Sequence, residues 1–198
     1  TARIWEWVSI EGPVAGNKCY NQDTDCLSGT TAWTVVPAVS FENLTITTWK
    51  RTSGTGSPGN RTEMDTLFSA NAVATNRCGN GARSTIDAAG TSINPFAGTN
   101  GCGHNDYLTQ FDGNIVIPSD GNYQFAVDGD DAVDLRIGST NVVGWYGGHA
   151  NDRSSGGLDS HSDSIYLTAG TYTVRFRHQE AGGGEAWGLF WKPASGAN

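Results

Sequence analysis

The chain has 198 residues and a formal net charge of −8, with only 12 Lys and Arg residues. This balance disfavours binding to nucleic acids, heparin-like polymers or acidic membrane surfaces, because each of these partners needs a positive patch. No apolar run is long enough for a membrane-spanning helix, so we expect no membrane insertion. The 27 glycines and the many Thr, Ser and Asn residues are typical of short strands joined by turns and long loops.

The first half of the chain mixes strand-like runs with a long polar segment. Runs at 4–10, 33–39 and 44–49 predict strands, and most of the tryptophans in them are expected to pack in a core. Residues 51–110 are expected to be irregular, and they start with a loop rich in Gly and Ser. A Met-Leu-Phe set at 64, 67 and 68 has helical spacing there, but the window is short for a helix.

The four cysteines predict disulfides rather than a metal or redox site. They are Cys19, Cys26, Cys78 and Cys102, and no pair has the CxxC spacing of a zinc or redox motif. Four cysteines permit three connectivities, of which we favour the sequential one. The second bridge would then staple a Gly/Asn/Thr-rich segment to the surface. Disulfides in turn predict an extracellular or cell-surface location.

The second half of the chain reads as a series of antiparallel strands. Alternating apolar residues predict strands at 115–117, 123–127, 133–137, 165–167, 172–176 and 186–192. Trp187 and Trp191 alternate on the last of these and are expected in the core. Many short strands with one buried face predict an all-β, antiparallel β-sandwich with long disulfide-stapled loops. No repeat or linker divides the chain, so residues 1–198 are expected to form a single domain.

Two adjacent carboxylates, Asp130 and Asp131, lie at the turn between two of these strands. Neighbouring side chains on a regular strand point to opposite faces, but at a turn they can converge. Two hard anionic oxygens that meet at one point suit a calcium ion. The pair is therefore the strongest candidate for a functional site.

Residues 111–192 resemble the PA14 family, a β-sandwich module of bacterial adhesins and yeast flocculins. Three segments carry the resemblance in family order, namely 111–125, 130–138 and 164–172, and 189–191 closes it. Residues 1–110 form a more divergent half with added loops. The module usually begins with a short strand that pairs with its last one, and 3–10 is expected to play that part.

The resemblance implies a calcium-dependent sugar site. In sugar-binding members, two consecutive aspartates joined by a cis peptide hold a calcium ion that binds vicinal sugar hydroxyls, and Asp130 and Asp131 match that pair. A late loop completes the calcium shell with backbone and side-chain oxygens. The matching loop is 177–185, with Gln179, Glu180 and Gly183 as candidate ligands.

A second polar loop, 144–152, is expected to contact the sugar. Besides the two aspartates and Gln179, the candidate sugar-binding residues are Trp145, Tyr146, His149 and Asn151. Aromatic rings offer area and a polar edge to a pyranose ring. The alternative for Trp145 is that it caps one end of the core.

Together these features predict a calcium-dependent carbohydrate-binding (lectin) domain of a secreted or surface adhesin. Its partner would be a cell-surface or polymeric carbohydrate, and the domain would be monomeric within a larger adhesin. We expect no enzyme, because two aspartates that share a cation stay ionised and cannot act as a general acid. One alternative is a calcium-ordered structural or protein-binding PA14 module without sugar binding. Another is a carbohydrate-binding module cut from a larger enzyme.

Overall fold

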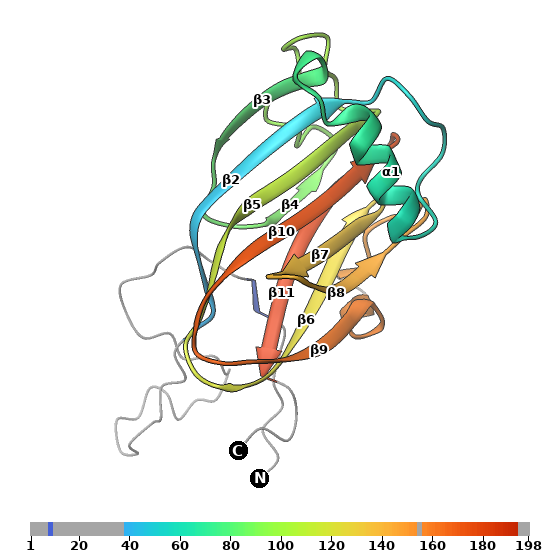
Figure 1. The fold of residues 1–198 in the computed structure, drawn as a ribbon. Helices are drawn as coiled ribbons and strands as arrows, with labels where there is room; N and C mark the ends of the chain where they lie inside the picture. The colour runs from blue at the N-terminus through green and yellow to red at the C-terminus, as the bar shows by residue number, and fades with distance from the viewer. Residues whose placement is uncertain (1–7, 10–37, 154–155, 194–198) are drawn as a thin grey trace, which may run out of the picture.

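The computed structural model describes residues 8–9, 38–153 and 156–193, and its strands form two antiparallel sheets that face each other (Figure 1). The first sheet has the order β1 (Val8–Ser9), β11 (Glu185–Pro193), β6 (Gly121–Asp130) and β9 (Ser162–Leu167), with β4 (Asp87–Gly90) also paired to β11. The second sheet has the order β3 (Arg77–Ala82), β2 (Ser40–Lys50), β5 (Tyr107–Ile117), β10 (Gly170–Glu180), β7 (Val133–Ile137) and β8 (Thr140–Trp145). The predicted antiparallel β-sandwich is confirmed.

The core fills the space between the two sheets. Alternation along each strand turns every second side chain inward, and Phe111, Phe125 and Phe176 are at most 1% exposed. Trp187 and Trp191 are also buried in this core, as predicted. Burying an aromatic ring in this way contributes about 1.5–3 kcal/mol each relative to an exposed ring.

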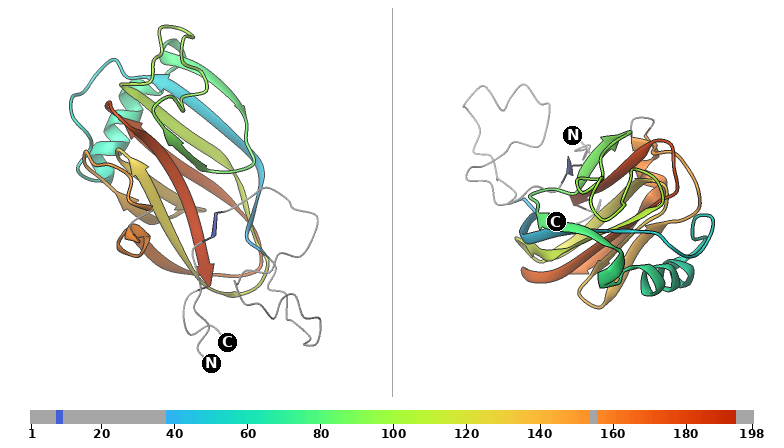
Figure 2. Two further views of the ribbon diagram at one scale, coloured as in Figure 1. Left: turned by 180° about the vertical axis from the view of Figure 1, so that it is seen from behind. Right: turned by 90° about the horizontal axis from the view of Figure 1, so that it is seen from above.

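Helix α1 (Arg61–Asn71) covers part of the outer face of the second sheet (Figures 1 and 2). The Asn60 side chain accepts a hydrogen bond from the Glu63 backbone N–H and so caps the first turn. The residues with helical spacing, Met64, Leu67 and Phe68, are buried against Trp49 and Leu108 of the sheet. The helical spacing seen in the sequence therefore corresponds to a true helix.

The expectation that 51–110 is irregular is wrong. This segment holds α1, the 3-10 turn Ala74–Asn76, β3, β4 and the start of β5. Glycine at alternate positions hides the strand pattern of β3, which is held by pairing with β2. β8 was also not predicted, and it pairs with β7. A second 3-10 turn, Gly157–His161, follows it.

Two further expectations concern the ends and the cysteines. Val8 and Ser9 pair antiparallel with Trp191 and Phe190, which agrees with an N-terminal strand beside the last one. The Cys78–Cys102 disulfide is present as predicted. Cys19 and Cys26 lie outside the described residues, as do the tryptophans at positions 5, 7 and 33. No helix in the described ranges is long and apolar enough to cross a membrane.

Candidate metal and ligand site

The site lies where the chain crosses between the two sheets at one end of the sandwich. Asp130 ends β6 in the first sheet, and Val133 begins β7 in the second. The peptide bond between Asp130 and Asp131 is cis, as the resemblance implies. The crossing places both aspartates at the edge of the core, where Asp130 is 9% exposed and Asp131 is 7% exposed.

The loop between β10 and β11 crosses at the same end and is tied to the aspartates. The Asp131 N–H donates to the Gln179 carbonyl at 3.2 Å, and the Gln179 N–H donates to the Ala132 carbonyl at 2.8 Å. The Asp131 carboxylate accepts from the Ala181 N–H at 2.9 Å. These bonds fix the position of the late loop relative to the aspartate pair.

Three carboxylates meet between these two crossings. One oxygen from each of Asp130, Asp131 and Glu180 lies within 4.8 Å of the other two. Glu180 is fully buried, and neither of its oxygens has a hydrogen-bond partner in the described structure. Its Oε2 lies 3.7 Å from Nε2 of the equally buried His178, which is too long for a hydrogen bond. An unpaired buried carboxylate is costly unless it is neutral or bound to a cation. The donor set of carboxylate oxygens fits a hard divalent ion such as calcium.

Burial and mutual repulsion perturb the acids in this cluster. Burial, reinforced by Asp131, Asp130 and Glu185, raises the pKa of Glu180 to about 9. Burial, reinforced by Asp131, Asp128 and Glu185, raises the pKa of Asp130 to about 6. A bound divalent cation would reverse both shifts, because it stabilises the ionised forms.

The late loop between β10 and β11 approaches the aspartates closely because residues 182–184 are all glycine. A Cβ on Gly184 would lie only 2.6 Å from Oδ2 of Asp130, so no larger residue fits without moving that carboxylate. Gly183 has a φ of 107°, in the region that favours glycine. The backbone at Gly183 is therefore free to take the turn that carries the chain past the carboxylates.

If this cluster holds calcium, substituting Gly184 by alanine should weaken the binding by about tenfold or more, because the added methyl group displaces the Asp130 carboxylate. Isothermal titration with calcium would measure the loss. Gly182→Ala is the matched control, since a Cβ there meets only Asn105 at 3.5 Å. Equal calcium affinities for both variants would contradict this placement of Asp130.

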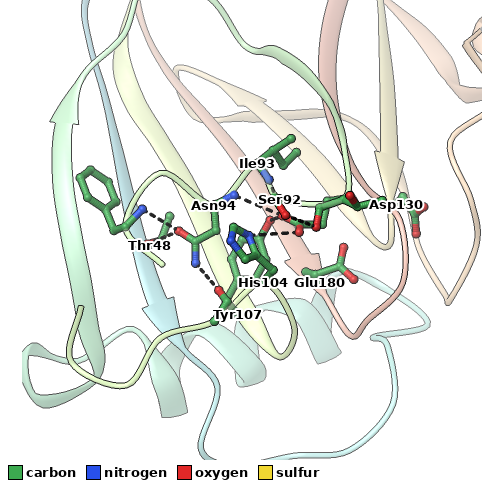
Figure 3. A network of polar contacts seen from close by, with 12 residues as sticks. Thr48, Ser92, Ile93, Asn94, His104, Tyr107, Asp130 and Glu180 are labelled. Carbon is green, nitrogen blue, oxygen red and sulfur yellow. Dashed lines mark hydrogen bonds and ion pairs between the residues drawn. The ribbon is translucent and has the colours of Figure 1, made fainter. Parts of the chain in front are cut away.

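A polar network that includes Asn94, His104 and Tyr107 supports the site from the side of the disulfide-closed loop (Figure 3). The Glu185 carboxylate accepts from the backbone N–H groups of Ile93 and Asn94 and from the Tyr107 hydroxyl at 2.7 Å. The His104 ring lies 3.3 Å from its other oxygen. Glu185 therefore holds the segment before Cys102 against the start of β11.

The buried side chain of His178 holds the backbone of the aspartate pair in place. Burial lowers the pKa of its imidazole to about 4, so the ring is neutral at physiological pH. Its Nε2 lies 2.8 Å from the Asp130 carbonyl and is the donor in that contact, because a carbonyl oxygen only accepts. No motif spacing around His178 indicates this role in the sequence.

The structure brings some predicted sugar contacts to the cluster and not others. The His149 N–H donates to the Asp131 carboxylate at 3.1 Å, so the loop 144–152 does reach the site. Asn151 is half-buried in the same loop. Strand alternation puts the Gln179 side chain on the opposite face of β10 from Glu180. The contact that Gln179 makes with the aspartates is through its backbone.

The two aromatic residues of this loop are engaged elsewhere. His149 and His161 stack on opposite faces of the Trp145 ring, with centroids 3.5 and 3.6 Å away. Neither face of this indole is open to a sugar ring. The Tyr146 hydroxyl donates to Asp134, and its ring packs on the apolar cluster beneath α1. These contacts favour the alternative reading of Trp145 as a cap on the core.

Two further loops border the site, the one before α1 and the one before β5. Their turn-like composition does not identify them in the sequence as part of a binding site. The Gly147 N–H donates to the Pro58 carbonyl at 2.8 Å, which joins the loop before α1 to the loop after β8. The Asp106 N–H donates to the Ala181 carbonyl at 3.2 Å. The loop before β5 therefore lies beside the late loop, on the far side of the carboxylates.

Comparisons with known proteins agree with this architecture. The PA14 domain family matches residues 65–197. The PA14 sugar-binding domain of an RTX adhesin is 18% identical with a TM-score of 0.59, over 80% of this chain and 93% of that one. The PA14 domain of the MpAFP antifreeze protein is 12% identical with a TM-score of 0.55, over 84% and 89% of the two chains.

A third similar structure is an anti-sigma factor domain-containing protein from Clostridium clariflavum. It is 19% identical with a TM-score of 0.55, and the match covers 77% of this chain and 42% of that one. At such identities the likeness to solved structures shows the fold alone. No curated protein matches the chain in sequence. The family match spans more than half of the chain and most of the sandwich, and the chain therefore belongs to the PA14 domain family.

Proposed function

We propose that this PA14 domain is a calcium-dependent carbohydrate-binding module. The observation that carries the proposal is the convergence of Asp130, Asp131 and Glu180, whose oxygens lie within 4.8 Å of one another at the edge of the core. One of these converging acids is buried with no hydrogen-bond partner among the described residues and only the neutral His178 ring beside it, so a bound cation would stabilise the ionised cluster.

Calcium fits these residues better than magnesium or zinc. All three side chains offer oxygen, whereas zinc sites in proteins favour nitrogen and sulfur ligands. Calcium takes six to eight oxygen ligands in a flexible shell, and magnesium demands a stricter octahedron. The three carboxylates and the glycine-rich 181–185 segment would supply part of such a shell, with Gly183 as a candidate carbonyl ligand.

The remaining calcium positions are the proposed place for sugar. Two neighbouring hydroxyls of a saccharide are hard oxygen ligands and would complete the shell. The loops around His149, Pro58 and Asp106 would border that sugar and set its specificity. The description of one similar structure as a sugar-binding domain of an adhesin supports this choice of ligand. Trp145 stacking is not part of the proposal, since both ring faces are covered.

We infer that the domain binds carbohydrate without cleaving it. Glycoside hydrolysis uses two carboxylates about 5 Å or more apart across the scissile bond, one protonated and one ionised. The acids here converge on one point instead, an arrangement suited to a shared ion. The Cys78–Cys102 disulfide and the adhesin neighbour support an extracellular or surface location.

A broad glycan array tests the proposal, read once in millimolar calcium and once in EDTA. We expect binding only in calcium, to glycans that share one arrangement of vicinal hydroxyls. Individual sites should be weak, so multivalent presentation on the array is needed for detection. If calcium raises the melting temperature but no glycan binds, the domain is instead a calcium-ordered structural or protein-binding module.

A further inference from the structure

A second polar site lies on the outer face of the second sheet, well away from the carboxylates. A depression of about 420 Å³ is lined by residues of β5, β7 and β10 and of the turn after β7: Asp112, Gly113, Arg136, Gly138, Thr173, Val174 and Arg175. This volume is within the range of small-ligand pockets, roughly 300–1,000 Å³. Arg175 precedes Glu180 by five residues on β10, which places the two roughly 16 Å apart.

Strand register puts two arginines side by side in this depression. Arg175 on β10 is the direct cross-strand partner of Arg136 on β7, so both guanidinium groups project from the same face. Like charges directly opposite each other destabilise a sheet unless an anion lies between or beside them. On its other side Arg175 faces Asp112 of β5, to which its Nε donates at 2.7 Å.

The positive charge in the depression is only partly neutralised. Asp112 is the one acid that lines it, and it is already paired with Arg175. Arg136 is exposed and donates from Nε to the Gly138 carbonyl, but among the described residues it forms no ion pair. Two nearby arginines, Arg61 and Arg177, both pair with Asp134. Arg136 therefore gives this face a local positive charge, which the net charge of −8 over the whole chain does not reveal.

We propose that this depression binds the anionic group of an acidic saccharide, either a carboxylate or a sulfate ester. Guanidinium groups recognise such oxyanions through paired N–H donors, and the hydrogen bonds of Arg136 and Arg175 within the described structure use only their Nε atoms. The remaining lining consists of the exposed Thr173, the buried Val174 and two glycines, with no aromatic ring. That lining suits a ligand rich in hydroxyl groups.

This site can be tested by titrating sugars into the 198-residue chain and monitoring its backbone amide signals by NMR. The probes are glucuronate, galactose 6-sulfate and, as the neutral comparison, galactose, all in EDTA. We expect either anionic sugar to shift the amides of Gly138, Thr173 and Arg175, and galactose to leave them unchanged. Because calcium is absent, this result is independent of the metal-dependent site proposed above.

Three variants make the assignment specific. Arg136→Gln should weaken anion binding by about tenfold, the effect of losing one charge-assisted contact. Asp112→Asn should strengthen it, because it removes the competing carboxylate. Arg83→Gln is the charge-matched control, since Arg83 is exposed outside the depression, and it should change nothing.

Several results would overturn the proposal. They are the absence of shifts with both anionic sugars, equal shifts with galactose, and equal weakening by the substitutions at Arg136 and Arg83. Binding that appears only in calcium would also overturn it, because the ligand would then lie at the carboxylate site. Binding of one anionic sugar and not the other would support the site and identify its oxyanion.

Discussion

Replacing Asp130 by asparagine should abolish calcium-dependent sugar binding and leave the sandwich folded. The substitution removes one of the three charges that meet within 4.8 Å, and calcium affinity depends strongly on the number of charged ligands. We expect calcium affinity to fall by on the order of 100-fold. No hydrogen bond to the Asp130 carboxylate occurs among the described residues, so the variant breaks no bond of the fold.

Isothermal titration with calcium and the glycan array would measure this loss. Asp163→Asn on β9 is the matched control, because it removes the same charge from an exposed position. Asp131→Ala should lose calcium and sugar as well, but it also removes the acceptor for the His149 and Ala181 N–H groups. Unchanged calcium affinity of the Asp130 variant would contradict the proposed site.

Replacing Glu180 by glutamine should have opposite effects on calcium binding and on stability. Calcium affinity should fall, because a charged ligand is lost. The metal-free protein should become more stable at pH 8, because folding no longer requires a carboxyl that is ionised in the unfolded chain to take up a proton and be buried beside two aspartates. Such a trade between stability and function is common at binding sites.

The pH dependence of the metal-free protein follows from the same residue. The pKa of Glu180 rises from its ordinary value of 4.5 to about 9 on folding, so between these pH values the folded state holds a proton that the unfolded state releases. Stability is therefore lost as pH rises through this window, by at most about 1.4 kcal/mol per pH unit for one proton. Asp130 adds to the loss between its ordinary 3.8 and about 6.

Thermal unfolding in EDTA from pH 5 to pH 9 would show this loss. The melting temperature of the wild type should fall as pH rises, and calcium should restore it most at high pH. The Glu180→Gln variant should show a flatter profile. Glu42→Gln, at an exposed position on β2, is the control and should keep the wild-type slope. A wild-type slope in the Glu180 variant would show that the pH dependence arises elsewhere.

Much of the fold was predictable because its core strands alternate regularly. Runs such as Tyr123–Val127 and Val133–Ile137 have an apolar residue at every second position, and the structure buries those residues between the sheets. β3 and β8 escaped prediction because glycine and polar residues interrupt that pattern. Hydrogen bonds to β2 and β7 hold them in the sheet, and Val142 of β8 and Cys78 of β3 are buried there.

The site was predictable only in part. The adjacency of Asp130 and Asp131 at a turn was visible in the sequence, but the choice between Gln179 and Glu180 was not. One residue of register decides which of these two side chains faces the inside of the sandwich. The engagement of Trp145 with two histidines depends on His161, which comes from a separate turn. No local pattern encodes that contact.

The pairing of β1 with β11 has a mechanical consequence. Val8 pairs with Trp191 near one end of the first sheet, whereas Asp130 pairs with Ala186 at the other. From Ala186 to Pro193 the strand spans roughly 20 Å, at about 3.3 Å per residue. Tension applied at Val8 and Pro193 would open the β1–β11 hydrogen bonds one after another, as in a zipper. The carboxylates lie at the opposite end of the first sheet, so this tension does not act on them directly.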